Sequence, residues 1–517
     1  MLTIQKMAAF LISSNLAVAL PASLFNGSQS LEWKDCPSWL APGNSTLKCG
    51  NLSVPLDWDS PGKGPVTIGV MKLPARDPKN RIGNVFFQPG GPGNPGSGSV
   101  VQMATGQFQV GADILDRFDM IGVDPRGTGL SEPLKCDTQL TGAILPYYPS
   151  DPESFQKRVE HNLAVRKSCV ELSGNNLIDY MDSISIAKDY EAIRIAIGDE
   201  PMNWLGVSYG TQLGSQYAEL FPDNIRSMVL DGVVSQSQAQ ISQFLAGAVG
   251  LDATFRGFGQ WCQKQNATTC PAIQDSKNRS VEEMWTDIMI QTDHTPMPCT
   301  ASWCPVPTVT ADQLRYVATV YLSQEGKNWP KLGAGIYNMT LQNDASSYVQ
   351  ILFQETPSNS SARIVYDNAN SFANLAITCQ DWAHHDTTAE DLKLKQQLAR
   401  TQSFLLNGLS PAHAFQLQCI GWPGNTRNPP HAISIPKTAK LPKVLITETI
   451  YDPATTMTWG MQLREEIGKD RVVFVLKNGG GHSAYEQEDA AGGETKTAIE
   501  RYILDLTLPE DGVIFNS

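Results

Sequence analysis

The stretch NWLGVSYGTQLG places Ser208 between Gly206 and Gly210, at the point where an apolar, strand-like run ends. Gly-x-Ser-x-Gly between a strand and a helix is typical of the nucleophile elbow, a strained turn that lifts a serine hydroxyl above a sheet. Glycines flank the serine because side chains at those positions would collide with neighbouring atoms. The next residues, TQLGSQYAELF, have a helical pattern and supply the second half of the motif. We therefore predict that Ser208 is a catalytic nucleophile rather than a structural serine.

A serine nucleophile needs a general base and a carboxylate that orients the base, because the hydroxyl alone reacts poorly at neutral pH. In chains with this turn the three groups follow in the order serine, acid, histidine. His482, in NGGGHSAY after a late strand-like run, fits that order and is the predicted base. Asp452, in TETIYDPATT at the end of the preceding strand, is the predicted acid, and Asp231, in VLDGVV, is the alternative. Other histidines, such as His384 and His385, are expected on the surface or in an inserted segment.

The oxyanion of a tetrahedral intermediate needs two backbone N–H donors. One is the amide after the nucleophile, at Tyr209, and the other comes from the loop after an early strand. The loop FFQPGGPGNPGSGS has glycines that let the backbone approach a substrate oxygen, so we predict Gly91 as the second donor, with Gly90 as the alternative. The loop lacks the Lys and Ser/Thr of a phosphate-binding loop and the spacing of a dinucleotide fingerprint, so no cofactor is expected.

A mostly parallel sheet must position these residues. Between about 65 and 235, runs such as NVFFQPGG, FDMIGVDPRG, MNWLGVSYG and SMVLDGVV alternate with helical patterns, which predicts an α/β fold with crossover helices. Residues 236–437 change to Gln-, Ser- and Thr-rich helical stretches, and PKVLITETIYD and RVVFVLKNGGGH then resume the strands. We predict a core made of residues 20–235 and 438–517, with a mainly helical cap, residues 236–437, inserted between strands 6 and 7.

The N-terminus is typical of an exported chain. Residues 1–19 combine Lys6, an apolar stretch and the small-x-small pattern at Ala17 and Ala19, which predicts a signal peptide too short to span a bilayer. No later segment is long and apolar enough to cross a membrane, so we predict a secreted protein. Seven Asn-x-Ser/Thr sequons agree with a glycosylated chain. The predicted glycosylation sites are Asn26, Asn44, Asn51, Asn266, Asn278, Asn338 and Asn359.

Ten cysteines in an exported chain predict disulfides. Pairing of sequence neighbours is the simplest connectivity, although the sequence alone allows others. That connectivity joins Cys36 to Cys49, Cys136 to Cys169, Cys262 to Cys270, Cys299 to Cys304, and Cys379 to Cys419. No cluster of cysteine and histidine has the spacing of zinc ligands, so no metal is expected.

Charge excludes one class of partner. The 517-residue chain has a formal net charge of −13 and no Lys/Arg-rich run, so it repels phosphate backbones and is not expected to bind nucleic acid. The expected partner is a peptide, or a small ester or amide, that the serine attacks.

Several of these motifs occur together in a known family. QPGGPG, DPRGTGLS, GVSYGTQLGSQYAELFP, VLDGVV, AITCQDW, CIGWPG and the late Asp/His pair resemble the secreted tripeptidyl-aminopeptidase-like branch of the α/β-hydrolases, which is related to prolyl aminopeptidases. The resemblance covers most of the chain from about residue 50 onward. It implies an α/β-hydrolase fold, a triad of Ser208, Asp452 and His482, and a cap disulfide between Cys379 and Cys419.

Three functions remain open from the sequence. The first is a secreted serine exopeptidase that releases N-terminal residues or tripeptides, the second an esterase or amidase acting on a small molecule, and the third a non-catalytic binding protein. An aminopeptidase needs a carboxylate for the free ammonium of its substrate, and we predict Asp381, in TCQDW, with Trp382 lining an apolar subsite. The alternatives are a solvated acid and a core aromatic residue. Gln88 stands where prolyl aminopeptidases typically have His, and IYDPATT replaces their usual Asp-Pro-x-Thr-Pro pattern.

Overall fold

The structure is a computed structural model, and it describes most of the chain. The described residues are 30–40, 46–142, 145–275, 277–304, 306–351, 372–382, 384–423, 426–487 and 493–516. The predicted signal peptide, residues 1–19, and the sequons at Asn26, Asn44 and Asn359 lie outside these ranges.

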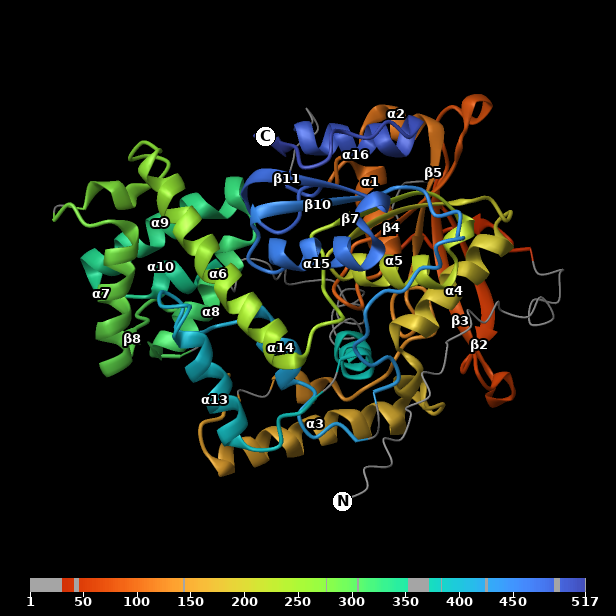
Figure 1. The fold of residues 1–517 in the computed structure, drawn as a ribbon. Helices are drawn as coiled ribbons and strands as arrows, with labels where there is room; N and C mark the ends of the chain where they lie inside the picture. The colour runs from red at the N-terminus through yellow and green to blue at the C-terminus, as the bar shows by residue number, and fades with distance from the viewer. Residues whose placement is uncertain are drawn as a thin grey trace, which may run out of the picture.

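One sheet forms the centre of the molecule, with strand order β1-β2-β3-β5-β4-β6-β7-β10-β11-β12 (Figure 1). All pairings from β5 to β12 along this order are parallel, and those among β1, β2, β3 and β5 are antiparallel. The strands are β1 (Lys34–Asp35), β2 (Lys48–Pro55), β3 (Pro65–Leu73), β4 (Gly83–Gln88), β5 (Phe118–Val123), β6 (Met202–Val207), β7 (Ile225–Asp231), β10 (Val444–Tyr451), β11 (Val472–Gly480) and β12 (Ile514–Phe515). Every residue of β4, β5 and β6 is buried, as expected for parallel strands covered on both faces.

Helices cover both faces of this sheet (Figure 1). One layer holds α1 (Gly96–Thr105), α2 (Ala112–Arg117) and α16 (Glu494–Asp505), and the other holds α4 (Ser183–Ala196), α5 (Tyr209–Leu220) and α15 (Met457–Ile467). Consecutive residues of a strand point to opposite faces, so Phe86 packs into one layer and Phe87 into the other. The predicted α/β-hydrolase architecture is confirmed.

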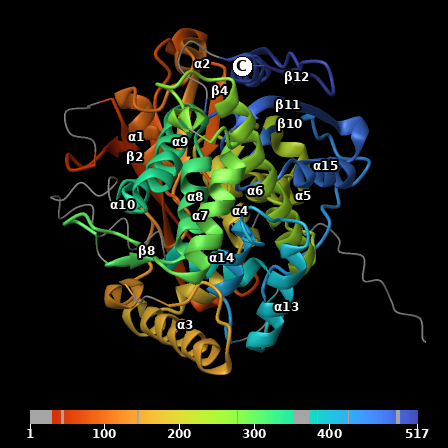
Figure 2. The same ribbon diagram turned by 90° about the vertical axis from the view of Figure 1, so that its left-hand side faces the viewer.

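The cap lies between β7 and β10, which are strands 6 and 7 of the sheet when the two-residue β1 is left out. It is mainly helical, as predicted, and Figure 2 shows α6, α7, α8 and α9 side by side in front of the sheet. Its elements are α6 (Gln240–Gln263), α7 (Val281–His294), β8 (Met297–Pro298), β9 (Thr308–Val309), α8 (Ala311–Leu322), α9 (Glu325–Gln342), α10 (Ser346–Val349), α13 (Ala389–Arg400) and α14 (Pro411–Leu417). The cap has its own apolar core, built around Trp285, Trp329 and Tyr348.

A segment ahead of the insertion also packs on the cap, which the sequence analysis did not predict. Helix α3 (Pro152–Ser173) contacts α13, and the ring of Tyr148 stacks on His413 of α14 at 4.3 Å between centroids. Burial lowers the pKa of His413 to about 3, so its imidazole is a neutral core group.

All five predicted disulfides are present, from Cys36–Cys49 to Cys379–Cys419. Among the described sequons, the asparagines at 51, 266 and 278 are exposed and the one at 338 is half-buried. Within the described ranges, no helix combines the length and the apolar character needed to cross a bilayer.

Candidate active site

Ser208 lies at the turn between β6 and α5 with φ 57° and ψ −127°, a conformation that non-glycine residues rarely adopt. Its amide donates to the Asp231 carbonyl oxygen at 2.9 Å, which fixes the turn against β7. A Cβ atom at Gly206 would lie 2.3 Å from the carbonyl oxygen of Gly210, and one at Gly210 would lie 2.5 Å from that of Gln88. These backbone contacts explain why glycines flank the serine.

His482 and Asp452 meet beside this turn. The His482 Nδ1 lies 3.1 and 3.0 Å from the two carboxylate oxygens of Asp452. Burial alone would lower the pKa of His482, but the charge and the hydrogen bond of Asp452 outweigh it and raise the pKa above its usual value. The pKa of Asp452 is lowered, because His482 and backbone donors overcome the effect of burial.

Backbone and side-chain donors hold the Asp452 carboxylate in place. One oxygen accepts from the amides of Ala454 and Thr455, both at 2.8 Å. The other accepts from the Thr455 hydroxyl at 2.8 Å and from the Ser483 amide at 2.9 Å. With these four donors on it, the carboxylate is fixed in position to accept from the imidazole.

Asp231, the alternative acid, makes different contacts. Its carboxylate accepts from the Thr447 hydroxyl at 2.7 Å and from the amides of Ala484 and Tyr485 at 3.0 and 2.8 Å. Among the described residues, no hydrogen bond joins it to His482. Asp231 therefore anchors the segment after the histidine, and Asp452 is the carboxylate that faces the imidazole.

The glycine-rich loop after β4 lies against the elbow. A Cβ at Gly90 would be 2.7 Å from the Val207 carbonyl oxygen, so only glycine fits there. The Gly90 amide donates to the side chain of Gln88 at 3.1 Å and is therefore occupied. Gly91 lines the same cavity as Ser208, and no described residue accepts a hydrogen bond from its amide. This difference favours Gly91 over Gly90 as a donor to an oxyanion.

A cavity of about 380 Å³ opens between these loops and the cap, in the size range of small-ligand sites. Its wall contains the side chains of Ser208 and His482 together with an apolar surface from the cap and α15. The lining residues are Pro89, Gly91, Pro92, Asn94, Ser208, Tyr209, Val234, Gln243, Trp382, Pro411, Ala412, Phe415, Ala454, Thr455, Trp459, His482 and Glu486.

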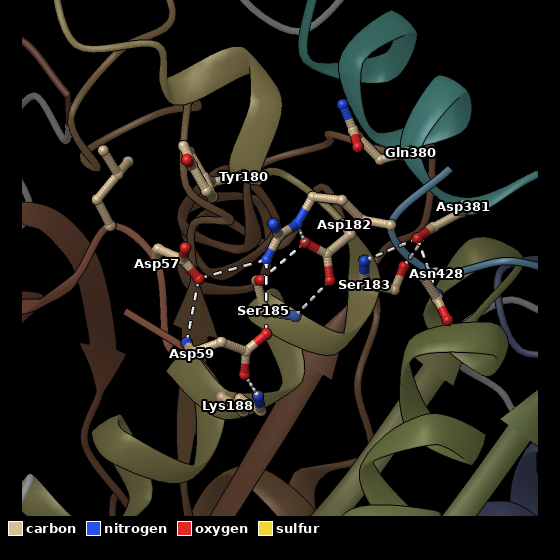
Figure 3. Close-up of polar contacts among 12 residues, drawn as sticks. Asp57, Asp59, Tyr180, Asp182, Ser183, Ser185, Lys188, Gln380, Asp381 and Asn428 are labelled. Atoms are coloured by element: carbon tan, nitrogen blue, oxygen red, sulfur yellow. Dashed lines mark hydrogen bonds and ion pairs between the residues drawn. The ribbon is translucent and has the colours of Figure 1, made fainter. Parts of the chain in front are cut away.

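Asp381 does not reach this cavity, so the prediction that it meets a substrate ammonium disagrees with the geometry. The residue is 1% exposed, and its carboxylate accepts from the Ser183 amide and hydroxyl at 2.9 and 2.5 Å and from Asn428 at 2.9 Å (Figure 3). It also accepts from Gln212 at 3.1 Å. Burial raises its pKa to about 7. The hydroxyl of Ser183 also bonds the phenol of Tyr209, so Asp381 ties the cap to the elbow.

Trp382, in contrast, lies where a subsite residue is expected. It lines the cavity, and its ring meets Phe415 edge to face at 5.5 Å between centroids. Its Nε1 donates to the Gln212 side chain at 3.2 Å, which fixes the ring in the cavity wall.

Glu486 is the acidic residue that the sequence analysis missed. Of the described residues that line the cavity, it alone is acidic, and none of them is Lys or Arg. Its side chain is exposed, and within the described part of the chain no hydrogen bond or ion pair reaches its carboxylate. The signal in the sequence was the spacing GHSAYE, which places the glutamate four residues after His482.

One group of possible metal-binding side chains was not expected. His384 offers a ring nitrogen within 4.8 Å of the sulfurs of Cys379 and Cys419, but these sulfurs are joined in a disulfide. A cystine offers no thiolate to a metal, so this group is not a metal site as it stands.

Comparisons with known proteins agree with this geometry. Residues 83–292 match the family model described as alpha/beta hydrolase fold, and residues 407–514 match the one described as TAP-like protein. The chain is 29% identical over 502 residues to serine protease Hip1 of Mycobacterium tuberculosis, covering 94% of this chain and 90% of that protein.

Two other relatives have different names. Tripeptidyl aminopeptidase of Streptomyces lividans is 28% identical, over 86% of this chain and 79% of that protein. Carboxylesterase B of M. tuberculosis is also 28% identical, over 92% of this chain and 88% of that protein. The fold, the elbow and the family matches together show that the chain is an α/β-hydrolase whose C-terminal part is similar to TAP-like proteins.

Proposed function

We propose that the chain is a secreted serine aminopeptidase that releases N-terminal residues or tripeptides from peptides through an acyl-enzyme. The observation that carries the proposal is one cavity wall that combines Ser208, His482 and the carboxylate of Glu486, which makes no hydrogen bond or ion pair with any described residue. A nucleophile and base perform acyl transfer, and a free carboxylate selects a substrate with a positive charge. The names of two relatives, serine protease and tripeptidyl aminopeptidase, point the same way.

Acylation uses these groups in a fixed order. The Ser208 hydroxyl attacks the scissile carbonyl while the Nε2 of neutral His482 takes its proton, and Asp452 stabilises the imidazolium that forms. The amides of Tyr209 and Gly91 donate to the oxyanion of the tetrahedral intermediate. The imidazolium then gives its proton to the leaving amine, and the acyl group stays on the serine.

Deacylation repeats these steps with water. His482 takes a proton from the water, which attacks the ester carbonyl, and the proton returns to the oxygen of Ser208. The released acid is the N-terminal fragment of the substrate.

Glu486 gives the substrate its orientation. In an aminopeptidase the α-ammonium lies on the acyl side of the scissile bond, so a carboxylate on the same wall as the nucleophile fixes how far the chain enters. The aromatic rings of Trp382, Phe415 and Trp459 line the cavity and suit apolar side chains of the bound residues.

The test compares a peptidyl-coumarin substrate that has a free amine with its N-acetylated counterpart. A charge-assisted hydrogen bond to a partly exposed carboxylate is worth about 1.5 kcal/mol, which is roughly ten-fold in kcat/KM. Glu486→Gln should therefore lose about ten-fold on the free peptide, with little change on the acetylated one. Glu510→Gln, at an exposed glutamate outside the cavity lining, is the matched control and should change neither.

Esterase activity on a small molecule is the second candidate, and the similarity to carboxylesterase B favours it. Equal cleavage of free and blocked peptides by the wild type would exclude the aminopeptidase proposal. Turnover of short acyl esters alone, with no peptide cleaved, would establish the esterase instead.

A further inference from the structure

The segment that carries His482 uses all of its backbone amides. From Gly480 to Tyr485, each N–H donates to an acceptor elsewhere in the fold. The amides of the last three residues bond the carboxylates of Asp452 and Asp231, and the Gly481 amide bonds the carbonyl oxygen of Tyr451 at 3.1 Å. These four contacts attach the segment to the sheet.

The other two amides bond the cap. The Gly480 amide donates to the carboxylate of Glu325, and the His482 amide donates to the carbonyl oxygen of Ser323 at 2.7 Å. Helix α8 ends at Leu322 and α9 begins at Glu325, so both acceptors belong to one tight corner of the cap. The backbone of the histidine is therefore bonded to the cap and its side chain to Asp452.

Packing makes this corner rigid. Trp329, on the first turns of α9, is 1% exposed, and its Nε1 donates to the Leu322 carbonyl oxygen at 3.2 Å. The ring lies directly on Gly480, where an added Cβ would be 2.0 Å from the Trp329 Cζ2 atom. The ring of Phe258, on α6, meets the same tryptophan edge to face at 5.7 Å between centroids. Through these contacts, the position of the histidine segment depends on how the cap core packs.

We infer that Glu325 is a positioning residue for His482, and that the hydrolase is fully active only when this corner of the cap is docked on the histidine segment. The inference rests on the proposed function, because it concerns the base of the same reaction. Glu325 acts through the backbone, since its carboxylate accepts from Gly480, two residues before the imidazole. Of the two cap acceptors, Glu325 bonds through its side chain and Ser323 through its backbone carbonyl. Substitution can therefore remove only the Glu325 contact.

The experiment measures the second-order rate of inactivation by a fluorophosphonate and the kcat and KM for a p-nitrophenyl ester. These small reagents report the serine and its base and need no peptide subsite. Glu325→Ala leaves the Gly480 amide without its acceptor, and a shift of the base of about 1 Å costs about a hundred-fold in rate. We expect kcat and the inactivation rate to fall about ten- to a hundred-fold in this variant, with KM unchanged.

Glu325→Gln keeps an acceptor oxygen and should stay within about three-fold of the wild type. Glu390→Ala, at an exposed glutamate in the first turn of α13, is the control for loss of a charge at a helix N-terminus and should leave all rates unchanged. Wild-type rates in Glu325→Ala would overturn the inference, and so would a Gln variant as slow as the Ala variant. If the wild type neither reacts with the fluorophosphonate nor turns over an ester, the proposed function itself fails.

A second pair of variants tests the corner without removing Glu325. Gly480→Ala places a methyl group against the Trp329 ring and should lower kcat, and Gly480→Ala combined with Trp329→Phe should recover part of the loss. Wild-type kcat in Gly480→Ala, or no recovery in a folded double variant, would show that the corner does not position the histidine.

Discussion

Asp452→Asn should lower kcat by about four orders of magnitude, because the amide selects the wrong tautomer of His482. The oxygen that faces the amides of Ala454 and Thr455 must stay an oxygen, since both are donors at 2.8 Å. The new NH₂ group then replaces the other oxygen, which lies 3.0 Å from Nδ1 and accepts from the Ser483 amide. It donates to Nδ1, which leaves the proton on Nε2, and Nε2 can no longer accept from the serine.

The direction in which the pH profile shifts gives an independent test of Asp452 as the acid. His482 must be neutral to act as a base, so activity rises with pH through its pKa. In the wild type the Asp452 charge raises that pKa against the opposing effect of burial, and neutralising the charge lowers it. The acid limb of kcat/KM should therefore move to lower pH in Asp452→Asn while the plateau falls.

Asp231→Asn is the matched control, because it removes an equally buried carboxylate that bonds the next two residues of the same segment. It should lower the melting temperature and cost far less kcat than the Asp452 variant. If a folded Asp231→Asn loses as much activity, or if the acid limb of Asp452→Asn stays in place, the assignment of the acid is refuted.

Ser208→Ala should remove fluorophosphonate labelling and lower kcat about a million-fold, with the melting temperature retained; residual turnover above about 1% would contradict the assignment. Asp381→Asn should cost about 2 to 4 kcal/mol of unfolding free energy, measured by denaturant titration, because its NH₂ group meets donors, and it should leave the preference for free over acetylated peptides unchanged. Gly210→Ala should lower kcat at least about a hundred-fold, since its Cβ meets the Gln88 carbonyl oxygen at 2.5 Å and the elbow must shift; full activity would disprove this reason for the glycine.

The elements that carry the candidate catalytic residues were predictable because local sequence rules govern them. A strand that runs into Gly-x-Ser-x-Gly and a helix defines the elbow around Ser208, and Asp452 was preferred to Asp231 because it follows the strand immediately before the one that leads to His482. Neighbouring cysteines also paired as expected, because short loops bring them together.

The substrate-facing residues were less predictable, because tertiary packing decides where a side chain points. Asp381 and Trp382 are adjacent in sequence, yet only the tryptophan reaches the cavity. The carboxylate turns back to Ser183 and Asn428, partners 198 and 47 residues away along the chain. The spacing GHSAYE places Glu486 near His482, but no local pattern shows that its carboxylate lines the cavity without a hydrogen-bond partner among the described residues.

The cap does more than cover the cavity, because it contacts each of the three segments that carry the proposed catalytic groups. Asn374 donates to the carbonyl oxygen of Pro92 in the oxyanion loop at 3.1 Å, and Asp381 reaches the elbow through the hydroxyl network that includes Tyr209. Ser323 accepts from the amide of His482. A loop held on one side by the sheet and on the other by the cap keeps its geometry only while both remain in place. Of the cap residues at these contacts, Asn374 and Asp381 bond through their side chains and Ser323 through its backbone carbonyl, and none of the three lines the cavity. If the proposed function holds, substitution of Asn374 or Asp381 should therefore disturb the loops around Ser208 without removing a contact to the substrate.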